Sequence, residues 1–294
     1  MTPKVSWMRP SMWCMTNKTR NSKVNKQRVP MMEQIRRMVR GVFGWDCPFY
    51  RLLGKMLNQI SILHSEGLKT ARQLSRLKAA SKGGTAEAIQ FSRLKYPFFV
   101  RPGMKDVSVV INNFIREEYG AIEPAFSPKV LVDGGAYIGD TSAYFLSKYP
   151  SLRSIAFEPM LDSFSMAKQN LALYGDRVEL LQIALTADGQ PISMTGEQTG
   201  AHASSKSEVK VQTMNIEQIL ARLPENRIDI LKLDVEGAEG SIFADADAAD
   251  RWLPRIGFII VETHGDDVTK TVLGALQAAN WAAQRVRNLY FCKP

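Results

Sequence analysis

Short apolar runs alternate with stretches of helical spacing along residues 130–294. Runs rich in Val, Ile and Leu between turn residues predict buried strands, whereas apolar residues three and four positions apart predict amphipathic helices. Strands are expected at 130–133, 154–159, 178–185, 228–237 and 256–264, with a hairpin over 191–214 and a last pair within 281–293, and helices at 140–148, 166–173, 215–223 and 266–279. Alternating strands and helices are typical of an α/β fold with a parallel sheet.

The first 129 residues follow a different pattern. Residues 1–30 are polar and basic without periodicity, which predicts disorder. Apolar residues at helical spacing follow in three stretches, at 31–43, 48–63 and 68–80. Residues 96–102 predict a short strand, and Asp106 is placed to cap the helix after it. The predicted divisions are a disordered segment (1–30), a helical N-terminal extension (31–95) and an α/β domain (96–294) with a lead-in (96–129) and a core (130–294).

The charge is distributed unevenly along the chain. The net charge is +9, but residues 1–105 carry 21 Lys and Arg against 4 Asp and Glu, whereas residues 106–294 carry 17 and 25. A basic arm on an acidic domain predicts peripheral contact with an anionic surface, such as a membrane, a nucleic acid or an acidic glycan. The alternative is a solvated pair of basic helices that covers the acidic body.

Two observations bear on the compartment. No apolar run reaches eighteen residues, and the basic N-terminus lacks the apolar segment of a secretory signal, so no transmembrane helix is expected. Cys14, Cys47 and Cys292 are odd in number and far apart, which fits neither a zinc site nor a disulfide framework. We therefore expect a cytoplasmic protein, with a location at the inner face of the membrane as the alternative.

The most informative stretch covers residues 130–142, VLVDGGAYIGDTS. A strand, a glycine turn and a helix in succession form the nucleotide-binding loop of an open α/β sheet. The stretch lacks the Lys and Ser/Thr of a phosphate-binding P-loop, and it also lacks the strict G-x-G-x-x-G of a dinucleotide site. A glycine-rich turn without a ligand is the alternative.

Polar side chains stand at the carboxyl ends of four expected strands, where an open parallel sheet binds its ligand. They are Asp133, Glu158, Asp234 with Glu236, and Glu262 with His264. Because buried acids are costly unless they are paired, this recurrence indicates a site. Glu158 follows Gly139 by 19 residues and is placed to accept hydrogen bonds from both hydroxyls of a ribose. Its alternative role is a cap for the following helix.

The candidate roles of the other polar residues differ. His264 is placed to take a proton from a hydroxyl near neutral pH, and a structural histidine is the alternative. Asp133 is expected to order the glycine loop. Asp234, Glu236 and Glu239 could together hold a divalent cation, but no histidine joins them in the motif, so a metal is not predicted. Glu239 could instead bind a helix N-terminus.

Two further polar residues have less direct roles in the sequence. His202 lies in the polar loop Gly196–Ser207, which could close over the site, and a solvated loop histidine is the alternative. Lys232 is expected to point away from the strand end and to lie on the sheet face or in a local pair.

Four motifs together resemble a known family. They are D-G-G-A-Y-I-G-D-T-S at 133–142, F-E-P at 157–159, L-K-L-D-V-E-G-A-E at 231–239 and V-E-T-H at 261–264. Their order and spacing resemble those of the FkbM-type S-adenosylmethionine-dependent methyltransferases. R-P-G-M-K-D at 101–106 looks like the lead-in segment of that family. The resemblance covers residues 95–290, and residues 1–95 have no such match.

The resemblance implies a Rossmann-like methyltransferase sheet of seven strands, mostly parallel with an antiparallel last strand. It also implies S-adenosylmethionine as the cofactor and O-methylation of a hydroxyl on a sugar, a glycan or a related metabolite. The implied cofactor-binding residues are Asp133, Gly134, Gly135, Ala136, Tyr137, Gly139, Thr141, Ser142, Glu158, Pro159, Ile183, Ala184 and Asp234. The loop 134–139 would hold the methionine end, Glu158 the ribose, and residues 182–184 the adenine.

The catalytic candidates come from the ends of two neighbouring strands. His264 or Asp234 is expected to act as the base, with Glu236 or Glu262 orienting it or the acceptor hydroxyl. One alternative is a non-catalytic cofactor-binding or scaffold protein whose basic arm binds polyanions. Another is a nucleic-acid methyltransferase, which the acid-rich main domain and the absence of an N/D-P-P-Y/F motif disfavour.

Overall fold

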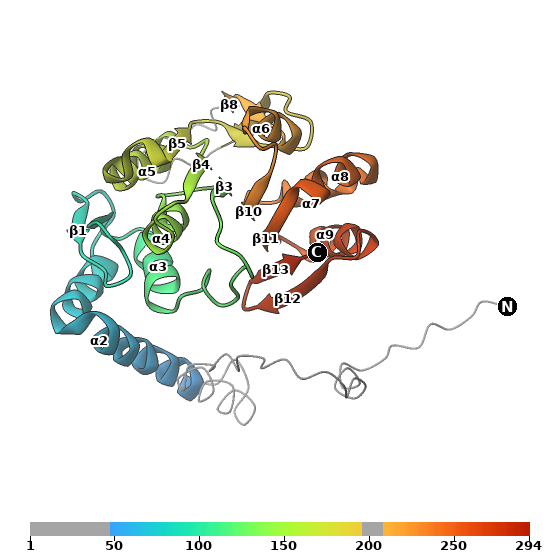
Figure 1. Cartoon of the computed structure of the whole chain (residues 1–294). Coiled ribbons are helices and arrows are strands. Elements are labelled where there is room, and N and C mark those ends of the chain that lie inside the picture. Colours follow the sequence, from blue (N-terminus) through green and yellow to red (C-terminus); the bar gives the residue numbers. More distant parts are fainter. Residues whose placement is uncertain (1–47, 196–207) are drawn as a thin grey trace, which may run out of the picture. The chain divides into compact units, whose positions relative to one another are not determined.

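The computed structural model describes residues 48–195 and 208–294 (Figure 1). The predicted disordered segment 1–30, the helix expected at 31–43 and His202 lie outside the described residues. The chain divides into two compact units, Met1–Lys55 and Met56–Pro294, and the second holds the sheet and the pocket. No helix in the described ranges is long and apolar enough to cross a membrane. The predicted domain boundaries stay predictions.

A seven-stranded sheet forms the centre of the second unit (Figure 1). Its strands are β3 (Val130–Gly134), β4 (Arg153–Phe157), β5 (Val178–Leu181), β10 (Ile228–Leu233), β11 (Ile256–Glu262), β12 (Ala282–Val286) and β13 (Leu289–Lys293). They lie in the order β12-β13-β11-β10-β3-β4-β5. The pairs from β11 to β5 are parallel, and β13 is antiparallel to both neighbours. The predicted fold class, with an antiparallel last strand, is confirmed.

Helices cover both faces of this sheet, because alternate strand residues point to opposite sides. On β10, Ile230 packs into one apolar core and Leu231 and Leu233 into another. The first core takes in α3 (Asp106–Val110), the π-helix η1 (Ile111–Ile115), α4 (Asp140–Lys148) and α5 (Leu161–Leu171). The second takes in α6 (Ile216–Arg222), α7 (Glu239–Ala244), α8 (Ala246–Trp252) and α9 (Asp266–Ala278).

The remaining described elements lie outside the main sheet. Helix α2 (Pro48–Ala79) begins at the expected proline and is interrupted at Gly67, which has φ 78°. Three short strand pairs lie outside the main sheet: β1 (Glu87–Ile89) with β2 (Phe98–Val100), β6 (Ala184–Leu185) with β9 (Thr213–Met214), and β7 (Ile192–Thr195) with β8 (Glu208–Val211). The 3₁₀ segments are η2 (Ala172–Arg177) and η3 (Leu253–Arg255). The β7–β8 pair is the predicted hairpin, since its strands are antiparallel.

The structure corrects three expectations. The strand expected at 178–185 is split, because β6 leaves the main sheet to pair with β9. The strand expected at 228–237 ends at Leu233, and Glu236 then takes a left-handed backbone with φ 51°. Asp106 does not cap its helix: it is the first helical residue, and its carboxylate accepts hydrogen bonds from the backbone N–H and guanidinium of Arg101.

Candidate active site

A pocket of about 420 Å³ opens at the carboxyl ends of β3, β4, β10 and β11. This edge is the topological switch point, because the chain passes from β3 to β4 on one side and β10 lies on the other. The glycine loop, the end of β10 and the lead-in helices line the pocket. The predicted site residues on its wall are Gly135, Tyr137, Thr141, Glu158, Pro159, Ala184, Asp234, Glu236 and Glu262.

The other predicted residues lie behind that wall or beside it. They are Asp133, Gly134, Ala136, Gly139, Ser142, Ile183 and His264. Asp133 and Ser142 are buried and form a support, because the Ser142 hydroxyl donates to the Asp133 carboxylate at 2.6 Å. His264 reaches the pocket through its contacts with Asp234 and Glu236.

The glycine loop is shaped by close approaches within the chain itself. Gly135 and Gly139 have φ of 78° and 82°, in the region that favours glycine. A Cβ on Gly135 would overlap the carbonyl oxygen of Asp234, and one on Gly139 would lie 2.9 Å from Leu171. The N–H groups of Gly135 and Ala136 donate to a carbonyl at the end of β4, at 3.0 and 2.8 Å. The glycines therefore allow two strand ends and a helix to meet.

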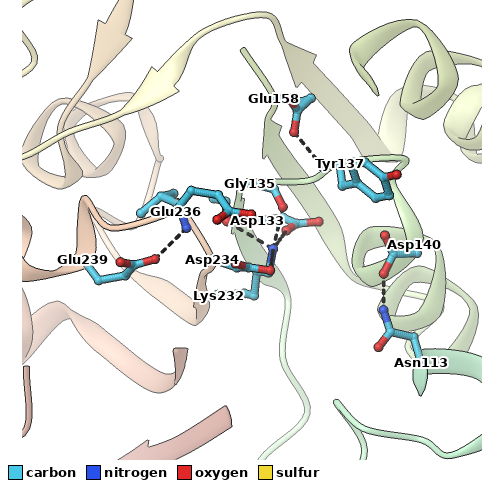
Figure 2. Close-up of polar contacts among 12 residues, drawn as sticks. Asn113, Asp133, Gly135, Tyr137, Asp140, Glu158, Lys232, Asp234, Glu236 and Glu239 are labelled. Carbon is cyan, nitrogen blue, oxygen red and sulfur yellow. Dashed lines mark hydrogen bonds and ion pairs between the residues drawn. The ribbon is translucent and has the colours of Figure 1, made fainter. Parts of the chain in front are cut away.

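Lys232 lies within this site and does not point away from it, contrary to the expectation. Its side chain is 3% exposed, and its Nζ donates to the carbonyl oxygens of Gly134 and Gly135 at 3.2 and 2.6 Å. The same Nζ lies 3.3 Å from Asp133 and 3.9 Å from Asp234. Figure 2 shows these acids around Lys232. In the sheet register, Lys232 is paired with Asp133, which explains why the two side chains meet.

Glu158 stands at the end of β4, facing the loop (Figure 2). It is 6% exposed, and one carboxylate oxygen accepts the backbone N–H of Tyr137 at 2.8 Å while the other accepts that of Met160 at 2.9 Å. Burial raises the pKa of Glu158 to about 7. Each oxygen keeps a second lone pair, so this carboxylate can accept further hydrogen bonds from a ligand in the pocket.

The lead-in segment supplies the remaining wall. The Tyr137 hydroxyl donates to buried Asp106 at 2.7 Å, which ties the glycine loop to α3. The π-helix turns Asn113 toward Asp140, and the Asn113 amide donates to that carboxylate (Figure 2). Burial raises the pKa of Asp140 to about 7, although the nearby Lys232 ammonium opposes this shift. Single-turn π-helices are frequent at functional sites.

His264 is held by Glu239, for which the sequence predicts only a role as a cation ligand or as a partner of a helix N-terminus. Glu239 is fully buried, and its carboxylate lies 3.0 Å from Nδ1 of His264. The other ring nitrogen, Nε2, lies 3.6 Å from both Asp234 and Glu236. Burial lowers the pKa of His264, but Glu239 and then the other two carboxylates outweigh it and raise the pKa above its ordinary value.

Glu239 is fixed by the turn in front of its helix. Its two oxygens accept the backbone N–H groups of Val235 at 2.8 Å and Gly237 at 2.9 Å. With these donors in place, Glu239 can hold the Nδ1–H of His264 and leave a lone pair on Nε2. Glu262, the last residue of β11, lines the same side of the pocket, and burial followed by the charge of Asp234 raises its pKa.

The side chains around Nε2 can also be considered as metal ligands. Asp234, Glu236 and His264 each offer a ligand atom, and these atoms all lie within 4.8 Å of one another. The Glu236 side chain is 83% exposed, whereas those of Asp234 and His264 are 28% and 30% exposed. The same geometry suits a protonated imidazole between two carboxylates.

Comparison with known proteins matches the region that contains these residues. The family model described as the methyltransferase FkbM domain matches residues 133–280, which is half of the chain. The chain belongs to the FkbM methyltransferase family. This confirms the resemblance given by the four motifs, and it makes the protein a methyltransferase.

Individual relatives of this FkbM-family chain are distant. Methyltransferase 1 of Beauveria bassiana is 25% identical over 226 residues, covering 64% of this chain and 90% of the relative. Methyltransferase sdnD of Sordaria araneosa is 27% identical over 171 residues, covering 45% and 65%. Among solved structures, Methyltransferase FkbM from Methylobacillus flagellatus KT is 14% identical, with a TM-score of 0.42 and coverage of 64% of this chain and 53% of that one.

Proposed function

We propose that this methyltransferase uses S-adenosylmethionine to methylate a hydroxyl group of a sugar, a glycan or a related polyhydroxylated metabolite. The observation that carries the proposal is the His264–Glu239 pair. A buried carboxylate 3.0 Å from Nδ1 orients an imidazole whose Nε2 lies beside Asp234, a residue of the pocket wall. A histidine held by an acid in this way is the arrangement of a general base.

The residues of the pocket fit the cofactor. Glu158 is a buried carboxylate that keeps free lone pairs toward the pocket, as the two hydroxyls of a ribose require. Gly135, Tyr137 and Thr141 would lie along the methionine portion, and Ala184 beside the adenine. When bound, the cofactor supplies an electrophilic methyl group on a positively charged sulfur. The acidic lining of the pocket, which includes Asp234 and Glu262, suits that positive charge.

The chain has two tasks in the transfer. The first is alignment, because holding the two reactants in line can lower a barrier by about 7–11 kcal/mol. The second is proton removal: Nε2 of neutral His264 takes the proton of the acceptor hydroxyl, and Glu239 stabilises the imidazolium that forms. Carboxylates such as Glu262 and Glu118, which line the pocket, can accept hydrogen bonds from neighbouring hydroxyls of a sugar. This favours a hydroxyl-rich acceptor.

The pKa of His264 sets the expected pH dependence. Because the Glu239 carboxylate raises that pKa, the base is protonated and inactive at low pH, and the rate rises as the pH passes through the raised pKa. Replacing Glu239 by glutamine removes the charge that raises the pKa. The pH midpoint of the rate is therefore expected to move downward in Glu239→Gln.

The test has two stages. Calorimetry measures S-adenosylmethionine binding, and mass spectrometry then measures the gain of one methyl group on a panel of simple glycosides. His264→Gln is expected to bind the cofactor normally and to lower kcat by about 10²–10⁴. The matched control is His64→Gln, an exposed histidine of α2, which should retain the wild-type rate. Absence of cofactor binding in the wild type would refute the proposal, and an unchanged kcat in His264→Gln would remove the assigned base.

A further inference from the structure

Lys232 has three features that a lysine on a sheet face does not need. The residue is buried, its Nζ donates to two carbonyl oxygens of the glycine loop, and that Nζ lies between Asp133 and Asp234, which come from the ends of two different strands. Burying an ammonium is costly unless it is paired and hydrogen-bonded. The ion pair with Asp133, its neighbour in the register, and the two carbonyl acceptors together compensate the buried charge.

The hydrogen bonds fix the loop from two sides. The N–H groups of Gly135 and Ala136 point to β4, where they donate to the carbonyl of Phe157. The carbonyl oxygens of Gly134 and Gly135 point the other way, to Nζ of Lys232. The two peptide planes on either side of Gly135 are therefore each held by β4 on one side and by β10 on the other.

The same ammonium reaches the acid beside the base. Its Nζ lies 3.9 Å from a carboxylate oxygen of Asp234, whose other oxygen lies 3.6 Å from Nε2 of His264. The titratable groups around the ammonium include Tyr119, Asp133, Asp140 and Asp234, and its charge also acts on Glu158 and Glu262. Burial would lower the pKa of Lys232, but the surrounding groups raise it above its ordinary value, so the side chain is an ammonium at neutral pH.

We propose that Lys232 is a positioning residue that sets the cofactor-binding glycine loop and the Asp234–His264 side of the pocket relative to each other. This inference rests on the proposed function, because the loop is taken to hold S-adenosylmethionine. Lys232 is one of the residues lining the pocket, and its contacts connect the glycine loop with Asp234. It thereby links binding of the methyl donor to alignment of the acceptor.

The test compares Lys232→Met, which keeps the length of the side chain and removes its charge, with the wild type. Calorimetry with S-adenosylmethionine is expected to show Kd raised roughly 10- to 100-fold, the loss typical of removing a group that orients a binding element. Lys270→Met on α9, where the lysine side chain is 77% exposed, is the control and should bind as the wild type does.

A pH profile separates positioning from general loss of stability. The Lys232 ammonium lowers the pKa of both Glu158 and Asp140, so its removal lets both rise further. The pH midpoint for cofactor binding should therefore move upward in Lys232→Met. A variant that only weakened the fold would lose melting temperature and leave this midpoint in place.

The outcomes are distinguishable. If the wild type does not bind S-adenosylmethionine, the proposed function fails. If the wild type binds it and Lys232→Met binds with the same Kd and pH midpoint, the positioning role is overturned and the proposed function stands. If Lys232→Met does not fold by circular dichroism, Lys232→Gln, a neutral hydrogen-bond donor, takes its place with the same expectations. If neither variant folds, Lys232 is a folding residue and the inference is overturned.

Discussion

The charge of Glu158 can be removed with almost no change of shape by the substitution Glu158→Gln. In the free protein both carboxylate oxygens accept backbone N–H groups, from Tyr137 and from Met160. A glutamine retains one acceptor oxygen but places its NH₂ group against one of these donors. The substitution therefore removes the charge offered to a ribose and leaves one buried backbone N–H without an acceptor.

The expected loss follows from these two effects. A hydrogen bond to a charged group contributes about 1.5–3 kcal/mol, and the glutamine retains one neutral acceptor for the ribose. A net loss of about 2–3 kcal/mol corresponds to an increase in Kd of roughly 30- to 140-fold. The increase in Kd is expected at pH 8.5, where wild-type Glu158, with a pKa of about 7, is almost fully ionised.

The pH dependence makes the prediction specific. At pH 5.5 only about 3% of a group with a pKa of about 7 is ionised, so wild-type affinity should fall by roughly 15- to 30-fold and approach that of Glu158→Gln. Asp140 also has a raised pKa of about 7, but it titrates in both proteins, so the ratio of their Kd values isolates Glu158. Calorimetric titration with S-adenosylmethionine across this pH range measures that ratio.

The contribution of Glu158 to the stability of the free protein should fall as the pH rises, whereas its contribution to cofactor affinity rises. Because the folded-state pKa of Glu158 is raised, the folded protein binds a proton more tightly than the unfolded chain does. The stability from this group is present below its ordinary pKa of 4.5 and is lost as the pH rises to about 7. Glu158→Gln removes this slope, so the melting temperatures of the two proteins should draw closer as the pH rises.

A control and a contrary result complete this test. Glu179→Gln removes an acid that pairs with Arg222 at the surface, outside the pocket, and should leave Kd unchanged at every pH. A Kd ratio between wild type and Glu158→Gln that stays constant from pH 5.5 to 8.5 would refute the reasoning, because the charge of Glu158 would then play no part in binding.

Two further predictions concern the loop and the acids around Nε2. Gly135→Ala should lower the free energy of unfolding, measured by urea denaturation, by about 2–4 kcal/mol, because the added Cβ would overlap the Asp234 carbonyl at a positive φ. The control is Gly274→Ala, at a helical site with open space around it, which should raise the free energy of unfolding by up to about 1 kcal/mol. Equal effects of the two substitutions would contradict this account. A chelator should leave methyl transfer unchanged, because Nε2 of His264 is expected to exchange protons and not to bind a metal. Inhibition that added Mn²⁺ reverses would instead make Asp234, Glu236 and His264 a metal centre.

The parts of the fold that the sequence predicted are those that depend on local pattern. The core strands followed from short apolar runs, and α4 follows the glycine turn at its expected residues, Asp140–Lys148. The short helix α8 was not predicted, although its signal was present, since Asp245 caps it by accepting the N–H of Ala248. The cap expected of Asp106 failed because Arg101, five residues upstream, competes for the same carboxylate.

Lys232 and Glu239 have roles in the structure that differ from those predicted, because their contacts come from residues far away along the chain. Lys232 meets carbonyl groups nearly a hundred positions away, and this contact depends on the register between β10 and β3. The sequence predicts a cation ligand or a partner of a helix N-terminus at Glu239, because nothing in LKLDVEGAE shows that His264 approaches it from the end of β11. Periodicity identifies the strand that carries a residue, but pairing of the strands decides what that residue meets.

Those contacts also separate the two candidates for the base. Asp234 lies between Lys232 at 3.9 Å and His264 at 3.6 Å, so a proton taken by its carboxylate would leave the buried ammonium with one counter-charge fewer. A proton taken by Nε2 of His264 instead forms a cation among Asp234, Glu236 and Glu239, all of which can balance it. Charge balance within the pocket therefore supports the proposal of His264 as the base, with Asp234 as a carboxylate that would stabilise the imidazolium.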